Sequence, residues 1–187
     1  QTVGSSINDQ EHPQIAIDSS GVSTVVWDGR DDSFDFHVGL RRIDADGTPI
    51  GSTQFLDPTA SRMPHVAVAP NGTAMVSFYF YDGSDYRAGA VSVDSSGSVG
   101  NYELISASGA DIDIETVRPA ITPSGVSAVI WSYDEAELQL QWFNPDGSLS
   151  GSTVIIDTLA DNFDYYYPPS VGAGPDGTFT LAWGRDT

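Results

Sequence analysis

The stretch Pro13-Gln14-Ile15-Ala16-Ile17-Asp18-Ser19-Ser20-Gly21, which runs on to Trp27, is the first of four copies of one pattern. In each copy a proline opens a short apolar run, a turn glycine follows, and an aromatic residue stands six positions after that glycine. The prolines are Pro13, Pro64, Pro119 and Pro169, the glycines are Gly21, Gly72, Gly125 and Gly177, and the aromatics are Trp27, Phe78, Trp131 and Trp183. The glycine and the aromatic recur after 51, 53 and 52 residues, a period typical of blade-type β-repeats.

One repeat contains four expected strands, which in the first copy cover residues 15–17, 22–27, 36–43 and 53–56. The hairpin Asp44-Ala45-Asp46-Gly47 joins the third strand to the fourth, and its glycine supplies the positive φ that such turns require. The second and third copies repeat this plan, whereas the fourth reaches only Trp183-Gly184-Arg185-Asp186-Thr187.

This plan predicts an all-β protein, a β-propeller of four-stranded antiparallel blades with about three and a half repeats. We expect a single domain or propeller fragment over residues 1–187, in which residues 1–12 supply a last strand. The expected repeats are about 13–63, 64–118, 119–168 and the partial 169–187. The alternative is a pair of stacked β-sandwich domains, but each of those usually needs ~100 residues and about seven strands.

The chain has no cysteine, so neither disulfides nor thiolate metal sites are available. It begins at Gln1, from which we expect a processed mature chain or a piece of a longer protein. The 26 acids face seven arginines and no lysine, for a net charge of −19. Such a surface repels phosphate and anionic lipid, which disfavours nucleic-acid binding and membrane insertion.

Most of the acidic residues fall on one predicted face. In a meander the alternate loops lie on opposite faces, so the tight glycine turns share one face and the longer loops share the other. Acidic loops suit oxygen-ligand cation sites, and we expect Ca²⁺ to be the cofactor if there is one. The candidate metal ligands are Asp28, Asp31, Asp32, Asp82, Asp85, Asp111, Asp113, Asp161 and Asp164. The alternative is a surface adapted to a salty extracellular medium, and the two interpretations stay open.

The same loops carry aromatic residues that could stack on sugar rings or anchor a protein partner. The candidate ligand-binding residues are Tyr81, Tyr86, Tyr133, Phe163, Tyr165 and Tyr166. Alternatively, several of these rings pack between blades. No Rossmann, P-loop or nucleophile-elbow motif occurs, and the histidines His12, His37 and His65 are scattered.

The repeat resembles those of large secreted bacterial surface proteins, which are often calcium-associated. Pro64-His65-Val66-Ala67, Asn71-Gly72 and Phe78 match the first half of that motif, and Arg42-Ile43-Asp44-Ala45-Asp46-Gly47 with Gly51 matches the second. The third repeat departs from it at Gln141-Trp142-Phe143, and no repeat has the Ser-x-Asp-x-Gly-x-Thr-Trp box of sialidase blades. The resemblance implies a structural or adhesive role outside the cell.

The sequence therefore predicts a non-enzymatic extracellular or cell-surface propeller module of an adhesive or assembly-forming protein. Its partner would be another protein, further copies of itself or a surface glycan. The alternative is a carbohydrate-binding lectin or carbohydrate-active enzyme that uses the same acidic, aromatic loop face. Two structural expectations accompany this prediction. The aromatic that ends each second strand packs between blades, and the chain does not close on itself as a complete ring.

Overall fold

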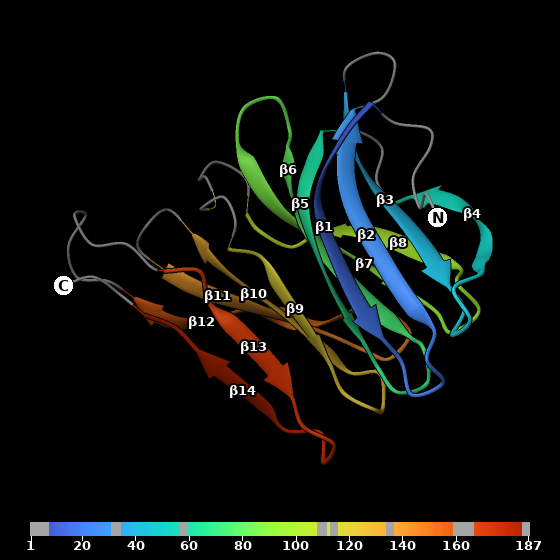
Figure 1. Ribbon diagram of the computed structural model, residues 1–187. Coiled ribbons are helices and arrows are strands. Elements are labelled where there is room, and N and C mark those ends of the chain that lie inside the picture. Colours follow the sequence, from blue (N-terminus) through green and yellow to red (C-terminus); the bar gives the residue numbers. More distant parts are fainter. Residues whose placement is uncertain are drawn as a thin grey trace.

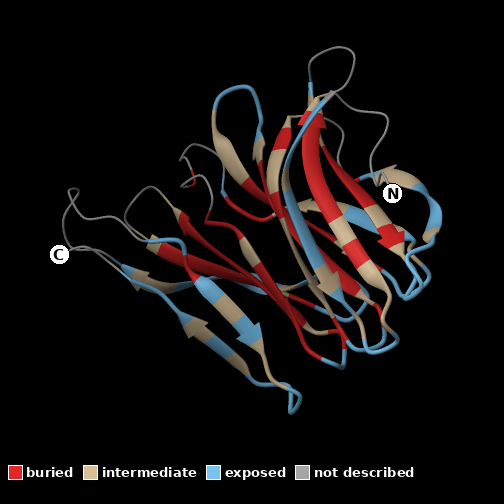
Figure 2. Ribbon diagram, viewed as in Figure 1, coloured by how far each residue is buried: buried red, intermediate tan, exposed pale blue. Residues whose placement is uncertain are grey.

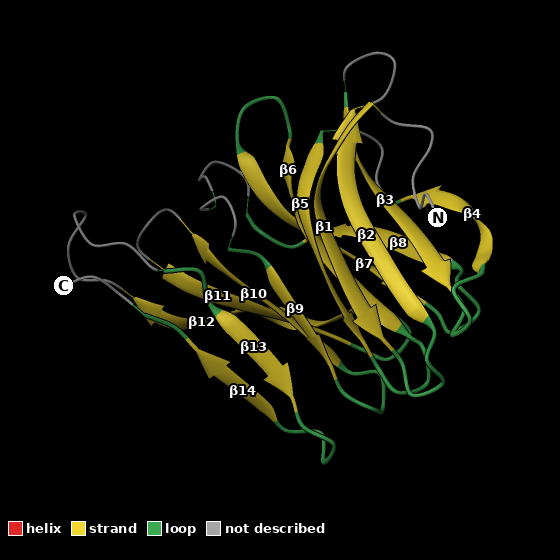
Figure 3. Ribbon diagram, in the orientation of Figure 1, coloured by secondary structure: helices red, strands yellow, loops and turns green. Residues whose placement is uncertain are grey.

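The computed structural model describes residues 8–30, 35–56, 60–107, 112, 116–133, 137–158 and 167–184. These residues form strands and turns and no helix (Figure 3). Within them, no segment forms a helix that is long and apolar enough to cross a membrane.

Three four-stranded antiparallel sheets and one two-stranded hairpin follow one another along the chain. Blade 1 consists of β1 (Asn8–Ile17), β2 (Ser23–Arg30), β3 (Phe36–Ile43) and β4 (Pro49–Phe55). Blade 2 consists of β5 (Ser61–Val68), β6 (Ala74–Tyr81), β7 (Tyr86–Val93) and β8 (Val99–Leu104). Blade 3 consists of β9 (Arg118–Ile121), β10 (Ser127–Tyr133), β11 (Glu137–Phe143) and β12 (Leu149–Thr158), and the hairpin consists of β13 (Ser170–Ala173) and β14 (Phe179–Ala182).

The first strands of successive units, β1, β5, β9 and β13, pack against one another in chain order. They are therefore the inner strands of an arc, with blade 1 at one end and the β13–β14 hairpin at the other (Figure 1). The prediction of an all-β fold built of four-stranded propeller-type blades is confirmed. Across the described residues the units form an arc in which blade 1 and the hairpin lie apart.

The units divide the chain slightly differently from the expected boundaries. β1 starts at Asn8, so residues 8–12 extend the first strand of blade 1 and pair with β2. A separate last strand would have to come from residues 1–7, which lie outside the described part of the chain. β5 likewise starts at Ser61, before Pro64.

The core lies between the sheets, as blade packing requires, and Figure 2 shows its buried strands in red. Between blades 1 and 2, Val26, Leu40 and Leu56 meet Val76 and Phe78. The next interface joins other members of β6 and β7 to blade 3, in a cluster formed by Met75, Tyr79, Ala88, Ala90, Val129, Trp131 and Phe143. Successive residues of β6 thus face opposite neighbours, which is the period of two expected for a strand buried on both faces.

Three of the four repeat aromatics have the packing role that their spacing predicts. Trp27, Phe78 and Trp131 are all at least 96% buried. Two glycines of the third strands make room for the rings of the first two blades: a Cβ at Gly39 would lie 2.7 Å from Trp27, and one at Gly89 would lie 2.9 Å from Phe78. The fourth aromatic, Trp183, is exposed, and its indole Nε1 donates a hydrogen bond to Asp157 Oδ2.

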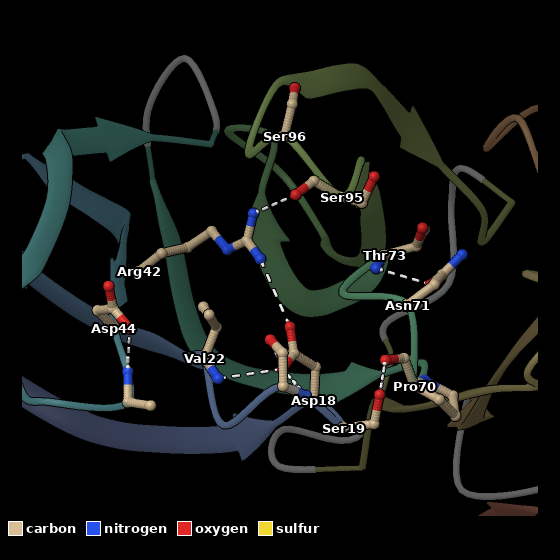
Figure 4. A network of polar contacts seen from close by, with 12 residues as sticks. Asp18, Ser19, Val22, Arg42, Asp44, Pro70, Asn71, Thr73, Ser95 and Ser96 are labelled. Carbon is tan, nitrogen blue, oxygen red and sulfur yellow. Dashed lines mark hydrogen bonds and ion pairs between the residues drawn. The ribbon is translucent and has the colours of Figure 1, made fainter.

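The tight turns of neighbouring blades contact one another (Figure 4). Arg42 of β3 donates from Nη1 to the Ser95 carbonyl of blade 2 at 2.6 Å, and its Nη2 lies 3.7 Å from Asp18 Oδ2. The backbone N–H of Ser19 donates to the Pro70 carbonyl at 3.2 Å. These bonds tie the turn end of blade 1 to that of blade 2.

Candidate functional site

The site is built at the seam between blades 1 and 2, near the ends of the strands that carry the longer loops. A groove there is lined by Asp35, Phe36, Ala60, Arg62, Tyr79, Tyr81 and Tyr86, and we call it the tyrosine groove. Its cavity volume is about 230 Å³. The ring centroids of Tyr81 and Tyr86 are 5.1 Å apart, and those of Tyr79 and Tyr86 are 5.5 Å apart with an edge-on geometry.

Arg62 connects this groove to two carboxylates. Its guanidinium carbon lies 3.9 Å from the centroid of the Phe36 ring, a distance at which cation–π attraction operates. From the same group, Nη2 donates to Glu11 Oε2 at 2.8 Å and Nε donates to Asp28 Oδ2 at 3.3 Å. One arginine thus reaches from an aromatic wall to two acidic side chains of blade 1.

Asp28 is fully buried, and both of its oxygens have partners. Besides the bond from Arg62, its Oδ1 lies 2.8 Å from His12 Nδ1. This contact occupies Nδ1 of His12, so Nε2 is the ring nitrogen through which His12 can meet a ligand. Asp28 therefore acts as an anchor that orients His12 and Arg62.

A second cavity lies beside the first, on the inner strands. Its volume is about 220 Å³, and its lining residues are His12, Gln14, Met63, Pro64, His65 and Arg118. We call it the inner-strand pocket. Because β1, β5 and β9 each contribute, the pocket lies on the concave side of the arc and spans three blades.

Three of the lining residues occupy the same register position in their blades. Gln14 pairs with Val26, His65 with Ser77, and Arg118 with Ile130. Each of these partners stands five residues after its turn glycine, so the three polar side chains are structural equivalents. The fourth member of this set, Ser170, pairs with Ala182 in the hairpin.

The backbone beside the pocket has unusual conformations at equivalent positions. His12 and Met63, each immediately before a repeat proline, have φ values of 48° and 49°. Asp9 and Ala60, three residues earlier in each repeat, have φ values of 49° and 64°. Residues other than glycine rarely adopt such angles, and the surrounding structure must hold them there. The ladder between β5 and β6 is irregular between Arg62 and His65, and β1 is irregular in the same place.

Burial changes the acid–base behaviour of two groups at the site. Burial, together with the electrostatic influence first of Arg118 and then of His12, lowers the pKa of His65 to about 4, so His65 is neutral at pH 7. Burial also raises the pKa of the Tyr79 hydroxyl, although Arg62 partly opposes this shift.

The structure brings two of the predicted ligand-binding residues together. Tyr81 and Tyr86 share the tyrosine groove. Tyr133 instead packs against the core cluster between blades 2 and 3 and forms a bridge with Ile112. Phe163, Tyr165 and Tyr166 lie outside the described residues.

The predicted metal ligands are distributed differently. Asp28 has the anchoring role given above, and its ligand oxygen lies within 4.8 Å of a carboxylate oxygen of Glu11 and a ring nitrogen of His12. Arg62 already contributes a positive charge between these carboxylates, which opposes a cation there. Asp82 accepts bonds from Ser84 and from the backbone of Asp85, and Asp85 Oδ2 accepts a bond from the Ser84 hydroxyl at 3.2 Å, so both carboxylates are engaged within their own loop. The other predicted ligands are outside the described residues: Asp31, Asp32, Asp111, Asp113, Asp161 and Asp164.

The sequence contains a signal for the inner-strand pocket that the spacing of the histidines alone did not reveal. His12, His65 and Arg118 each stand next to one of the repeat prolines, Pro13, Pro64 or Pro119. Because these prolines mark the innermost strand, polar residues beside them converge on the concave side. The histidines are scattered along the chain, yet two of the three meet in one pocket.

No protein-family model matches the sequence, and no curated protein matches it significantly. Solved structures do share the fold. A Hadza microbial sialidase is similar with a TM-score of 0.59 and 14% identity, over 94% of this chain and 40% of the sialidase. An endo-arabinase from Bacteroides thetaiotaomicron is similar with a TM-score of 0.57 and 12% identity, over 94% of this chain and 71% of the arabinase.

An exo-β-1,3-galactanase from Clostridium thermocellum is similar with a TM-score of 0.50 and 14% identity, over 88% of this chain and 45% of the galactanase. The three neighbours are named as enzymes that act on carbohydrate. The prediction of a non-enzymatic chain is therefore wrong and is corrected: this chain shares its blade fold with glycosidases.

Proposed function

We propose that this chain binds carbohydrate at the seam between blades 1 and 2, as the glycan-recognising part of a carbohydrate-active protein that works outside the cell. The proposal depends on the contacts of Arg62. Its guanidinium packs on the Phe36 ring in the tyrosine groove and also donates hydrogen bonds to Glu11 and Asp28. Sugar rings bind proteins through an aromatic face together with charged and polar hydrogen-bonding groups, and this seam supplies both.

The two tyrosines of the groove provide the apolar part of such a site. Tyr81 is 43% exposed and Tyr86 is partly exposed, so their rings are accessible to a ligand. Tyr79 lies deeper, and its raised pKa keeps the hydroxyl protonated at neutral pH. A protonated phenol both donates and accepts hydrogen bonds, which suits sugar hydroxyls.

Glu11 is the carboxylate of the pair that a sugar can reach. Its side chain is 47% exposed, whereas that of Asp28 is fully buried. Glycoside hydrolysis commonly uses two carboxylates that flank the scissile bond. Asp28 is too buried to flank a scissile bond. Chemistry at this seam would therefore use the Glu11 carboxylate, while Asp28 orients His12 and Arg62.

The test is calorimetric titration with oligosaccharides of arabinan and β-1,3-galactan and with a sialylated trisaccharide, together with an assay for released sugar. We expect at least one glycan class, in this set or on a broad glycan array, to bind. Tyr81→Ala and Tyr86→Ala should each weaken binding about tenfold, since loss of an aromatic contact worth ~1.4 kcal/mol changes Kd by that factor. Glu11→Gln should abolish any sugar release.

Tyr167→Ala is the matched control, because Tyr167 is 50% exposed, against 43% for Tyr81, but lies beside Gly184 at the other end of the arc. It should bind as the parent does. If the parent binds no glycan of a broad array, or if the two groove variants bind as tightly as the parent, the proposed function is wrong.

A further inference from the structure

We propose that the inner-strand pocket binds the carboxylate of an acidic sugar, so that the ligand of this chain is a uronate-containing glycan. This inference rests on the proposed function and names its ligand class. The pocket lies next to the tyrosine groove, and the two are joined through a chain of contacts from His12 to Asp28 to Arg62.

The first support is the character of the lining. The pocket-facing residues include two histidines and one arginine and no acidic residue. This is unusual in a chain with 26 acids, seven arginines and three histidines. Two acids near His12, Glu11 and Asp28, are already bound by Arg62, and Asp28 is bound by His12 as well. The lining of the cavity is therefore basic, although Arg118 Nη1 also donates to the Val117 carbonyl at 3.3 Å.

The second support is the geometry of the donors. His65 and Arg118 come from equivalent register positions on adjacent inner strands, and both line the pocket. His12 of β1 also lines the pocket, and its Nδ1 is the ring nitrogen that faces the Asp28 carboxylate. A guanidinium supplies a fixed positive charge, and a neutral imidazole such as His65 supplies one N–H donor. A charged guanidinium and an imidazole N–H from adjacent strands suit the two oxygens of a carboxylate better than they suit a neutral hydroxyl.

The third support is size. A cavity of about 220 Å³ is smaller than the ~300–1,000 Å³ of sites for drug-sized ligands. It accommodates one small charged group on a single sugar ring, while the adjoining groove of about 230 Å³ accommodates the neighbouring ring. A carboxylate in one cavity and an aromatic contact in the other describe an acidic oligosaccharide.

The experiment is an NMR titration that follows the imidazole signals of the three histidines at pH 7 and constant ionic strength. The probes are sodium glucuronate, glucose and sodium acetate. We expect glucuronate to move the signals of His12 and His65 saturably and to leave His37 unmoved. His37 packs on Phe55 of its own blade, at a centroid distance of 5.8 Å, and serves as an internal control. Glucose should move neither pocket histidine, and acetate should bind at least tenfold more weakly than glucuronate.

Arg118→Gln should weaken glucuronate binding at least tenfold, and Arg118→Lys, which keeps the charge, should retain part of the affinity. Arg41→Gln is the matched control, since the Arg41 side chain donates to the Gly51 carbonyl on β4. Equal binding of glucose and glucuronate, equal binding of acetate and glucuronate, or an unchanged affinity in Arg118→Gln would each overturn the inference. If neutral glycans bind and depend on Tyr81 while glucuronate does not bind, the inference fails and the proposed function stands.

Discussion

At the scale of single residues, many of the acidic side chains serve the backbone of their own turns. The Oδ1 atom of an aspartate or asparagine accepts the backbone N–H two residues further on in a recurring Asx turn. This bond occurs at Asp18, Asp46, Asn71, Asp82, Asp94, Asp146 and Asp176. The hairpin at Asp44-Ala45-Asp46-Gly47, which resembles the start of a calcium loop in sequence, is therefore held by its own backbone.

These bonds make stability depend on pH. Hydrogen bonds, first from the side chain and then from the backbone of Ser148, lower the pKa of Asp146, and those of Thr178 do the same for the pKa of Asp176. A carboxyl group whose pKa is lower in the folded state than in the unfolded state stabilises the fold at any pH above its unfolded pKa of ~4. This contribution to stability is lost as the pH falls through the folded pKa. We expect the denaturation midpoint to fall steeply below pH 4.

Asp146→Asn isolates one such contribution. Asn71 makes the same turn without a charge, so an asparagine at position 146 should keep the bond but lose its pH dependence. Asp146→Ala should destabilise the protein at pH 6 more than Asp146→Asn does, as measured by urea denaturation. The explanation is wrong if the parent and the Asn variant lose stability equally between pH 5 and pH 2.

Trp131 illustrates packing at the same scale. It is completely buried between blades 2 and 3, where it contacts the cluster that includes Met75 and Phe143. Trp131→Ala should lower the free energy of unfolding by about 3–5 kcal/mol, the usual range for a large buried aromatic. Trp183→Ala, at the equivalent but exposed position, is the control and should cost far less. Equal denaturation midpoints for Trp131→Ala and the parent would contradict this packing role.

At the scale of elements, the repeat spacing was sufficient to predict the second strand of each unit, because that strand follows a turn glycine and, in blades 1 to 3, contains a buried aromatic. The pairing of first and second strands supports this. In blades 1 to 3, the residue five positions after the turn glycine pairs with equivalent residues of β1, β5 and β9. The site was harder to predict. Tyr81 and Tyr86 could be placed in one loop, but the approach of Arg62 to Phe36 and Glu11 depends on the irregular ladder before Pro64. A sequence pattern does not reveal a backbone with positive φ at Met63 and Ala60.

Calcium binding by the longer loops stays a prediction. Acids concentrated in neighbouring loops repel one another, and an ion that binds only the folded state would stabilise it by mass action. We expect thermal unfolding in millimolar CaCl₂ to occur at a higher temperature than in chelator. NaCl at matched ionic strength is the control for general screening. An equal shift in NaCl and CaCl₂ would remove the calcium site from consideration.

At the scale of the whole molecule, the arc leaves one inner strand less covered than its equivalents. Ile15 and Ile17 of β1 are 61% and 62% exposed. Their equivalents in blade 2, Val66 and Val68, pack against the core cluster between blades 1 and 2. At the equivalent position of blade 2, the face of a neighbouring blade covers the two apolar side chains. The same kind of surface would cover Ile15 and Ile17.

We therefore expect the 187-residue chain to associate with further copies through this face of blade 1. The net charge of −19 opposes association, but at 0.15 M salt charges are screened beyond ~8 Å, so association should increase with NaCl. Light scattering should give a mass above 19.9 kDa that rises with protein concentration. The double variant Ile15→Asp with Ile17→Asp should restore the monomer mass. Leu149→Asp, at a 41% exposed position on blade 3, is the control and should not. A parent chain that stays monodisperse at 19.9 kDa at all concentrations and salt conditions would refute this interface.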